Sequence, residues 1–177
     1  MARNSLLAKQ SEAIYFVGDA KSYMLRLKWR AEGKEAEDIS SAAGADKAIR
    51  DQVISLHHHG SEIVLEVLKA FGADGLSVDA NGNGIPDSIK NRSDEEKDIL
   101  VAAVYGRGIN LAGEALATGK TSFLPQWSNL KSSMFLIIGL GRGALSSYGP
   151  YRVLGRGFHK VPGLFGGSRK LAETYLR

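Results

Sequence analysis

Cysteine is absent from this chain of 177 residues. Its absence excludes disulfide bonds, thiolate nucleophiles and zinc or iron–sulfur sites held by cysteine, but it leaves the cellular compartment open. The remaining composition, with 44% apolar and 24% charged residues, is that of a globular protein. The length suits one domain with a sizeable core, or a compact domain with an extended arm.

Long apolar runs are also lacking. The most apolar window, residues 134–145, contains Arg142 and is about twelve residues long, whereas a helix needs ~20 apolar residues to span a bilayer. Near the N-terminus, Lys9 and Glu12 interrupt any apolar stretch of the length that a signal peptide requires. We therefore expect neither a membrane span nor an export signal, and both a virion and the cytoplasm remain open as locations.

Negative charge is scarce in the last third of the chain. Residues 120–177 hold nine Lys and Arg but one Asp or Glu. Residues 1–119 hold 14 Lys and Arg and 18 Asp and Glu. This asymmetry predicts an acidic body over residues 1–119 and a basic segment or arm over residues 120–177.

Helical periodicity dominates the predicted body. From Asp46, apolar residues recur at steps of three, four and seven, which predicts a helix that ends at Gly72. These residues are Ile49, Val53, Leu56, Ile63, Val67 and Phe71. Ser93 and Glu96 form a capping-box pattern at the start of a helix that runs to about Ala117.

An earlier helix is predicted to begin at Asn4 or Ser5. Its apolar positions are Leu6, Leu7, Ile14, Val17, Tyr23, Met24 and Leu27. Together these patterns predict a mainly α fold, a small bundle of three or more helices.

Glycine and proline gather after Lys120. Three of the four prolines and nine glycines, the latter between Gly139 and Gly167, lie in this region. Both residues oppose long regular elements, so we expect an irregular or extended basic C-terminal segment. A short helix over residues 168–176 is compatible with the pattern.

Residues 79–90 have the oxygen spacing of a calcium loop. Oxygen side chains occupy positions 1, 3, 5 and 9, glycine occupies position 6, and position 7 supplies a backbone carbonyl. The side chains at positions 1, 3, 5 and 9 are those of Asp79, Asn81, Asn83 and Asp87. Position 6 is Gly84 and position 7 is Ile85. The stretch resembles the calcium loops of thrombospondin type 3 repeats and dockerins, which implies a calcium site. Lys90 stands where the family pattern has a glutamate, so we expect weak affinity, ~10⁻⁴ to 10⁻³ M. A plain turn between two helices explains the same residues.

Signals for catalysis are weak by comparison. His57, His58 and His59 are adjacent, so on a helix they point about 100° apart and cannot converge on one ion. No readable arrangement of serine, histidine and carboxylate occurs, so we expect a non-enzymatic protein.

The basic segment has two interpretations. Its cations are interleaved with aromatic and glycine residues: Arg142, Arg152, Arg156, Lys160, Arg169 and Lys170. Such a composition suits contact with protein neighbours or other copies of the chain, and it also suits nucleic acid. The sequence thus predicts a structural or assembly protein of a larger complex, such as a bacteriophage virion, stabilised by a calcium-type loop. The alternative is a nucleic-acid-binding protein that acts through residues 120–177.

The calcium loop leads to a direct test by thermal melting. With a dissociation constant of ~10⁻³ M, calcium at about 5 mM stabilises the folded chain by about 1 kcal/mol. The melting temperature should therefore rise by about 2–4 °C, and Asp87→Ala should remove the rise. Unchanged melting of the wild-type chain at several millimolar calcium leaves only the turn.

Overall fold

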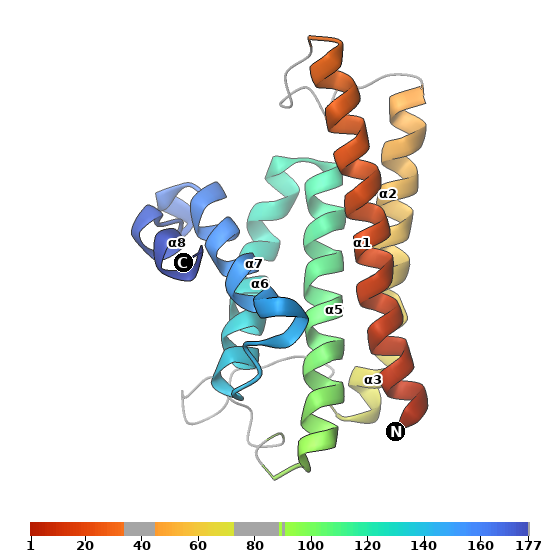
Figure 1. Cartoon of the computed structure of the whole chain (residues 1–177), viewed down its shortest axis with the longest axis vertical. Helices are drawn as coiled ribbons and strands as arrows, with labels where there is room; N and C mark the ends of the chain where they lie inside the picture. Colours follow the sequence, from red (N-terminus) through yellow and green to blue (C-terminus); the bar gives the residue numbers. More distant parts are fainter. Residues whose placement is uncertain (34–44, 73–88, 90, 177) are drawn as a thin grey trace.

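The computed structural model describes residues 1–33, 45–72, 89 and 91–176, and within these ranges the chain is helical and has no strand (Figure 1). The main helices are α1 (Ala2–Ala31), α2 (Ala45–Glu62), α3 (Leu65–Ala70), α5 (Asp94–Thr118), α6 (Lys120–Gly139), α7 (Leu145–Lys160) and α8 (Arg169–Leu176), with a 3-10 turn, η2 (Gly163–Phe165), before α8. The predicted mainly α bundle is confirmed.

Helix α5 is the centre of the bundle, with α1 and α2 packed along one side and α6 along the other (Figure 1). Its first turn is closed by the predicted capping box. The Glu96 amide donates to Ser93 Oγ at 3.2 Å, and the Ser93 amide donates to the Glu96 carboxylate at 3.0 Å. The bond from the Ser93 amide, and a second one from Ser93 Oγ, lower the pKa of the Glu96 carboxyl. The helix ends before Gly119, whose φ of 151° favours glycine.

The buried side chains of α5 surround the helix on most sides, because neighbours cover it from two directions. Of the helices in the described ranges, α5 alone has the length and apolar composition to cross a membrane. Of its most apolar stretch of 18 residues, 61% is buried inside the bundle. A core helix gives the same signal, so this is weak evidence for a membrane span.

The predicted helix from Asp46 to Phe71 is interrupted once. α2 ends at Glu62, and α3 begins at Leu65 after a turn. Near this break the Gly60 carbonyl accepts a hydrogen bond from Ser11 Oγ at 2.5 Å. The apolar face continues across the turn, since Val64 and Val67 are fully buried.

The prediction of an irregular C-terminal segment is wrong for most of residues 120–176, which form α6, α7 and α8. Tertiary packing explains why glycine is tolerated in these helices. A Cβ atom on Gly157 would overlap the Trp127 ring of α6, and one on Gly155 would lie 2.5 Å from Leu176 of α8. Glycine here lets helices approach closely, which outweighs a propensity cost of about 1 kcal/mol. Within residues 120–176, the backbone is irregular only around residues 140–148 and 161–168.

Helix α1 also departs from the prediction. It begins at Ala2 and has no side-chain cap, so neither Asn4 nor Ser5 caps it. Five of its seven predicted apolar positions are exposed, and the residues that face the bundle are mostly small or polar. Its buried residues are Ala8, Ser11, Gly18, Leu25 and Trp29. Small residues allow α1 to lie close to α2 and α5, and this choice of face leaves larger apolar side chains outside.

Candidate functional site

The outward side of α1 carries a continuous series of large apolar side chains, here called the outer stripe. It consists of Leu6 (65% exposed), Phe16 (50%), Val17 (49%), Tyr23 (55%), Met24 (65%) and Leu27 (39%). Steps of three, four and seven among several of these positions place them on one side of a helix. A contiguous exposed apolar surface of this kind marks interaction sites in proteins.

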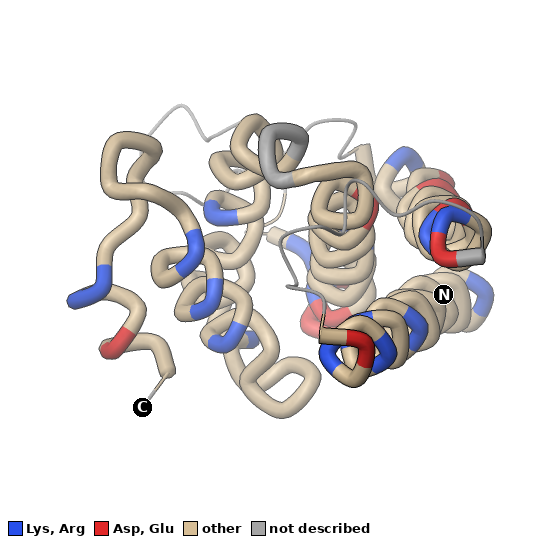
Figure 2. The backbone as a smooth tube through the Cα atoms, turned by 90° about the horizontal axis from the view of Figure 1, so that it is seen from above, with Lys and Arg blue, Asp and Glu red and all other residues tan. Residues whose placement is uncertain are grey.

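Helix α1 is rich in Lys and Arg, as the colours along its backbone show (Figure 2). Helix α1 has six cationic side chains, all exposed: Arg3, Lys9, Lys21, Arg26, Lys28 and Arg30. Its two acids have partners within the chain, because Glu12 accepts a hydrogen bond from Ser146 Oγ and Asp19 lies 3.9 Å from Arg26. Among the cations, Arg3 and Lys28 donate to Glu66 and Asp46 at 2.7 Å, and Arg26 lies near Asp19. Lys9, Lys21 and Arg30 are therefore the cations that give the outer stripe its positive charge.

The acidic character predicted for residues 1–119 is not spread over the helices. Within the described part of this range, Lys and Arg number twelve and so do Asp and Glu. The excess acids belong to residues 34–44 and 73–88, outside the described ranges. α1, with six cations and two acids, is itself basic.

The predicted cations of the C-terminal third divide into two groups. Arg152, Arg156 and Lys160, here called the basic row, follow one another at intervals of four along the exposed side of α7 (Figure 2). Arg169 and Lys170 are exposed on α8, which packs against α7. Five of the six cations thus lie on two adjacent helices.

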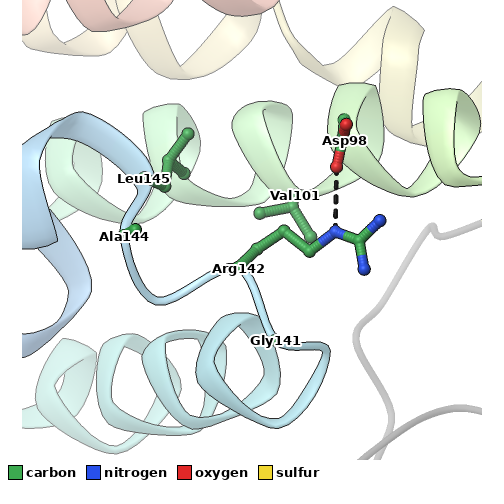
Figure 3. Close-up of a pocket in the computed structure, with 6 residues that line it drawn as sticks. All are labelled: Asp98, Val101, Gly141, Arg142, Ala144 and Leu145. Carbon is green, nitrogen blue, oxygen red and sulfur yellow. Dashed lines mark hydrogen bonds and ion pairs between the residues drawn. The ribbon is translucent and has the colours of Figure 1, made fainter.

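Arg142 lies apart from this group and has a structural contact. Its Nε donates to Asp98 Oδ1 at 2.9 Å and its guanidinium donates to Asp94 Oδ1 at 2.8 Å. Both acids lie in the first turns of α5, so Arg142 joins the α6–α7 connection to that helix (Figure 3). The bond to Arg142 lowers the pKa of Asp94. A shallow pocket beside these residues is lined by Val101, Gly141, Ala144 and Leu145 as well as Asp98 and Arg142.

The connection into α7 contains strained backbone. Ser146, Ser147 and Tyr148 have φ values of 51°, 54° and 61°, in the left-handed region. This conformation costs about 1–2 kcal/mol for each residue other than glycine. Contacts hold the turn in place, because Arg152 donates to the Ser146 carbonyl at 2.8 Å while Ser146 Oγ reaches Glu12 on α1. The turn therefore joins α7 to α1.

A buried polar network connects α1, α2 and α5, and the sequence did not reveal it. Asn110 Nδ2 donates to the Ser11 carbonyl at 2.9 Å and to the Gly106 carbonyl at 2.9 Å. Asn110 Oδ1 lies 3.1 Å from His57 Nδ1. Because the amide nitrogen already donates, Asn110 Oδ1 is the acceptor and His57 Nδ1 carries the proton.

Glycine makes room for the His57 ring. A Cβ atom on Gly18 of α1 or on Gly113 of α5 would lie 2.7 Å or 2.6 Å from this ring. The Tyr15 ring packs against it with centroids 5.4 Å apart, and burial raises the pKa of Tyr15 to about 12. A glycine inside a helix lowers its helix propensity, and packing must offset that cost. Glycines within predicted helices were therefore the available signal of this network in the sequence.

The predicted calcium site lies outside the described residues. Asp79, Asn81, Asn83, Ile85 and Asp87 all fall within residues 73–88, so calcium binding stays a prediction. Among the residues that the structure describes, no group of three or more His, Asp or Glu side chains is arranged to hold a metal ion.

Comparison of the chain with protein-family models, curated proteins and solved structures finds no match. The functional argument consequently depends on three features of the molecule. These are the outer stripe of α1, the cations of α7 and α8, and the buried polar network.

The network predicts a pH dependence of stability. Burial lowers the pKa of His57 below its ordinary 6.5, against the hydrogen bond to Asn110 and the weaker attraction of Asp19 and Glu114. His57 therefore binds a proton more readily in the unfolded chain than in the folded chain. Its contribution to the free energy of unfolding is complete above pH 6.5 and is lost as the pH falls below that value. We expect this term to reduce the free energy of unfolding by at most about 1.4 kcal/mol per pH unit.

Urea unfolding between pH 5 and pH 7.5 measures this effect. His57→Gln, which can still donate to Asn110, should lower stability at pH 7 by about 1–3 kcal/mol through lost packing. It should also flatten the pH profile below 6.5. His159→Gln on the exposed side of α7 is the control and should keep the wild-type profile. If the pH profiles of stability for wild type and His57→Gln were parallel, the pH dependence would not come from His57.

Proposed function

We propose that this chain is a non-enzymatic structural protein that assembles into a larger complex through the outer stripe of α1. The observation that carries the proposal is the simultaneous exposure of Phe16, Val17, Tyr23 and Met24 on a helix whose opposite side is packed against the bundle. A calcium-type loop at residues 79–90 would stabilise the chain within the complex.

The anchoring of α1 favours a rigid docking surface. At its C-terminal end, Trp29 Nε1 and Lys28 Nζ each donate to Asp46 of α2 at 2.7 Å. In its middle, Ser11 reaches Gly60 of α2 and Asn110 of α5. Because the helix is held in this orientation at both places, the outer stripe cannot turn inward without breaking buried hydrogen bonds, each of which contributes about 0.5–1.5 kcal/mol.

The exposed apolar area of the outer stripe limits the affinity that it can provide alone. Its six side chains are roughly half exposed, so covering each contributes on the order of 1 kcal/mol, or about 6 kcal/mol in all. Association costs about 4–15 kcal/mol in lost translational and rotational freedom. Apolar contact by itself thus gives at most a weak complex, and the cations of α1 must add to the affinity.

Density-gradient sedimentation of native cell material tests the proposal. We expect the chain to migrate with particles far larger than its own 19.0 kDa. The double substitution Phe16→Asp and Met24→Asp should release it to the position of a monomer, because two charges in the outer stripe must be desolvated on docking. Leu164→Asp, at a side chain that is 91% exposed in η2, is the matched control and should leave migration unchanged.

Two results would contradict the proposal. One is a wild-type chain that migrates as a free monomer in native material. The other is a particle that retains the Phe16→Asp and Met24→Asp variant as well as it retains the wild type. Thermal melting of each variant confirms that these exposed substitutions leave the fold intact.

Nucleic-acid binding is a second candidate function, favoured by the basic row of α7. Arg156 and Lys160 are exposed one helical turn apart, and Arg169 and Lys170 extend the cationic surface onto α8. Arg152 is less available, since it donates to the Ser146 carbonyl. Phosphate contacts by such cations give affinity without sequence specificity.

Salt dependence distinguishes this candidate. Binding of a single-stranded oligonucleotide should fall steeply between 50 mM and 200 mM salt, with a slope that reports the number of phosphate contacts. Arg156→Gln with Lys160→Gln should reduce that slope by about 1.4, since each phosphate contact on a single strand contributes about 0.7. No binding at low salt would remove this candidate.

A further inference from the structure

We infer that the partner of the outer stripe is the surface of an anionic lipid bilayer, along which α1 lies parallel to the membrane plane. The inference depends on the docking role proposed above and names the surface on which docking occurs. It is carried by the combination of one exposed apolar helix face with three exposed cations in or beside it, Lys9, Lys21 and Arg30, that pair with no carboxylate among the described residues.

The geometry of α1 fits a flat, fluid surface. From Leu6 to Leu27 the outer stripe extends about 31 Å along the helix axis, at 1.5 Å per residue. Of the exposed positions between the larger side chains on this face, Ala13 and Ala20 are also apolar and Lys9 is charged. The stripe is the convex side of a single helix, so it offers no groove to a partner. Such a face inserts about 5–10 Å into the boundary between headgroups and acyl chains.

The cations lie where lipid phosphates would be. With about 100° of rotation per residue, Arg3, Lys21 and Lys28 fall along one edge of the stripe. Arg26 and Arg30 fall along the other edge, together with the acids Glu12 and Asp19. Arg3, Lys28 and Arg26 are paired with Glu66, Asp46 and Asp19, so Lys21 and Arg30 are the edge cations without a carboxylate partner among the described residues. Lys9 alone lies within the stripe. Long cationic side chains at such an edge extend their charged ends to the interface while their methylene groups cover apolar surface. Each cation without a carboxylate partner contributes a roughly fivefold gain in affinity for an anionic surface.

Charge disfavours a second copy of the chain as the partner. Two α1 helices face to face would bring Lys9, Lys21 and Arg30 of one chain against those of the other, while Glu12 and Asp19 are already engaged within each chain. An acidic protein would need carboxylates along both edges of a 31 Å stripe, by the rise per residue given above. A bilayer that contains anionic lipid supplies negative charge on every side of the helix without such a match.

The internal packing is consistent with a peripheral position. α5, whose composition would suffice to cross a bilayer, is enclosed by α1, α2 and α6, so its apolar side chains are already covered. α1 itself carries eight charged residues and cannot span the hydrocarbon core. Contact through α1 alone therefore places the bundle on the membrane surface.

Vesicle flotation of the full chain is the experiment. The probes are vesicles of phosphatidylcholine alone and vesicles in which about 30% of the lipid is phosphatidylglycerol, a content that gives a negative surface potential. We expect the chain to float with the anionic vesicles, to remain behind with the neutral ones, and to be released as salt shortens the screening length.

Three variants assign the contact to α1. Phe16→Asp with Met24→Asp should abolish flotation. Lys9→Gln with Arg30→Gln removes two exposed cations and should weaken binding about 30-fold. Leu164→Asp alters an equally apolar side chain in η2, far along the chain, and should float like the wild type. Equal loss of flotation in Leu164→Asp would overturn the assignment to α1.

Detergent separates failure of this inference from failure of the docking role. Suppose the chain ignores anionic vesicles, while native material holds it in a detergent-resistant particle from which Phe16→Asp with Met24→Asp is released. The bilayer is then the wrong partner, and a protein neighbour covers α1. If the particle retains that variant too, the outer stripe is not a docking surface and both proposals are wrong. Flotation that depends on α1, together with a detergent-sensitive particle, supports both.

Discussion

The hydrogen bonds of Asn110 are the constraint on which the rest of this structure depends. One side chain of α5 donates to the Ser11 carbonyl of α1, accepts from His57 of α2 and closes on its own helix at Gly106. Because these groups are buried, each must keep its partner or lose about 1–3 kcal/mol. Three helices are thereby held in one rotational setting, whereas apolar contact alone is non-directional and would allow others.

The rotational setting of α1 determines what the molecule shows to its surroundings. With Ser11 and Gly18 turned inward, the larger Phe16, Val17 and Met24 are turned outward, since these positions lie on the opposite side of the helix. The same setting buries Leu25 and Trp29, so large apolar side chains lie on both sides of α1. The polar network and the glycine that accommodates the His57 ring select the observed setting, and an exposed apolar face is its consequence.

The C-terminal third follows the same physical rule of close approach. Gly157 lies against Trp127, Gly149 lies against the Tyr105 hydroxyl, and the left-handed turn at residues 146–148 brings Ser146 to Glu12. These contacts join α7 both to the central helix and to α1. The cations of α7 and α8 are consequently presented from packed helices, which gives the basic row a fixed spacing that a flexible arm would lack.

What the sequence determined by itself was local: a helical chain, the capping box at Ser93 and Glu96 that begins α5, its end near Ala117, and the buried face through Val53, Val67 and Phe71. Periodicity and caps act over a few residues, so they can be recognised without the fold. The tertiary structure alone decided that the glycine-rich third is helical, that Arg142 binds Asp94 and Asp98, and that α1 turns its larger apolar residues outward. Those outcomes depend on which surfaces meet across long separations in sequence. What a glycine or an asparagine contributes to the structure depends on the side chain that another helix places beside it.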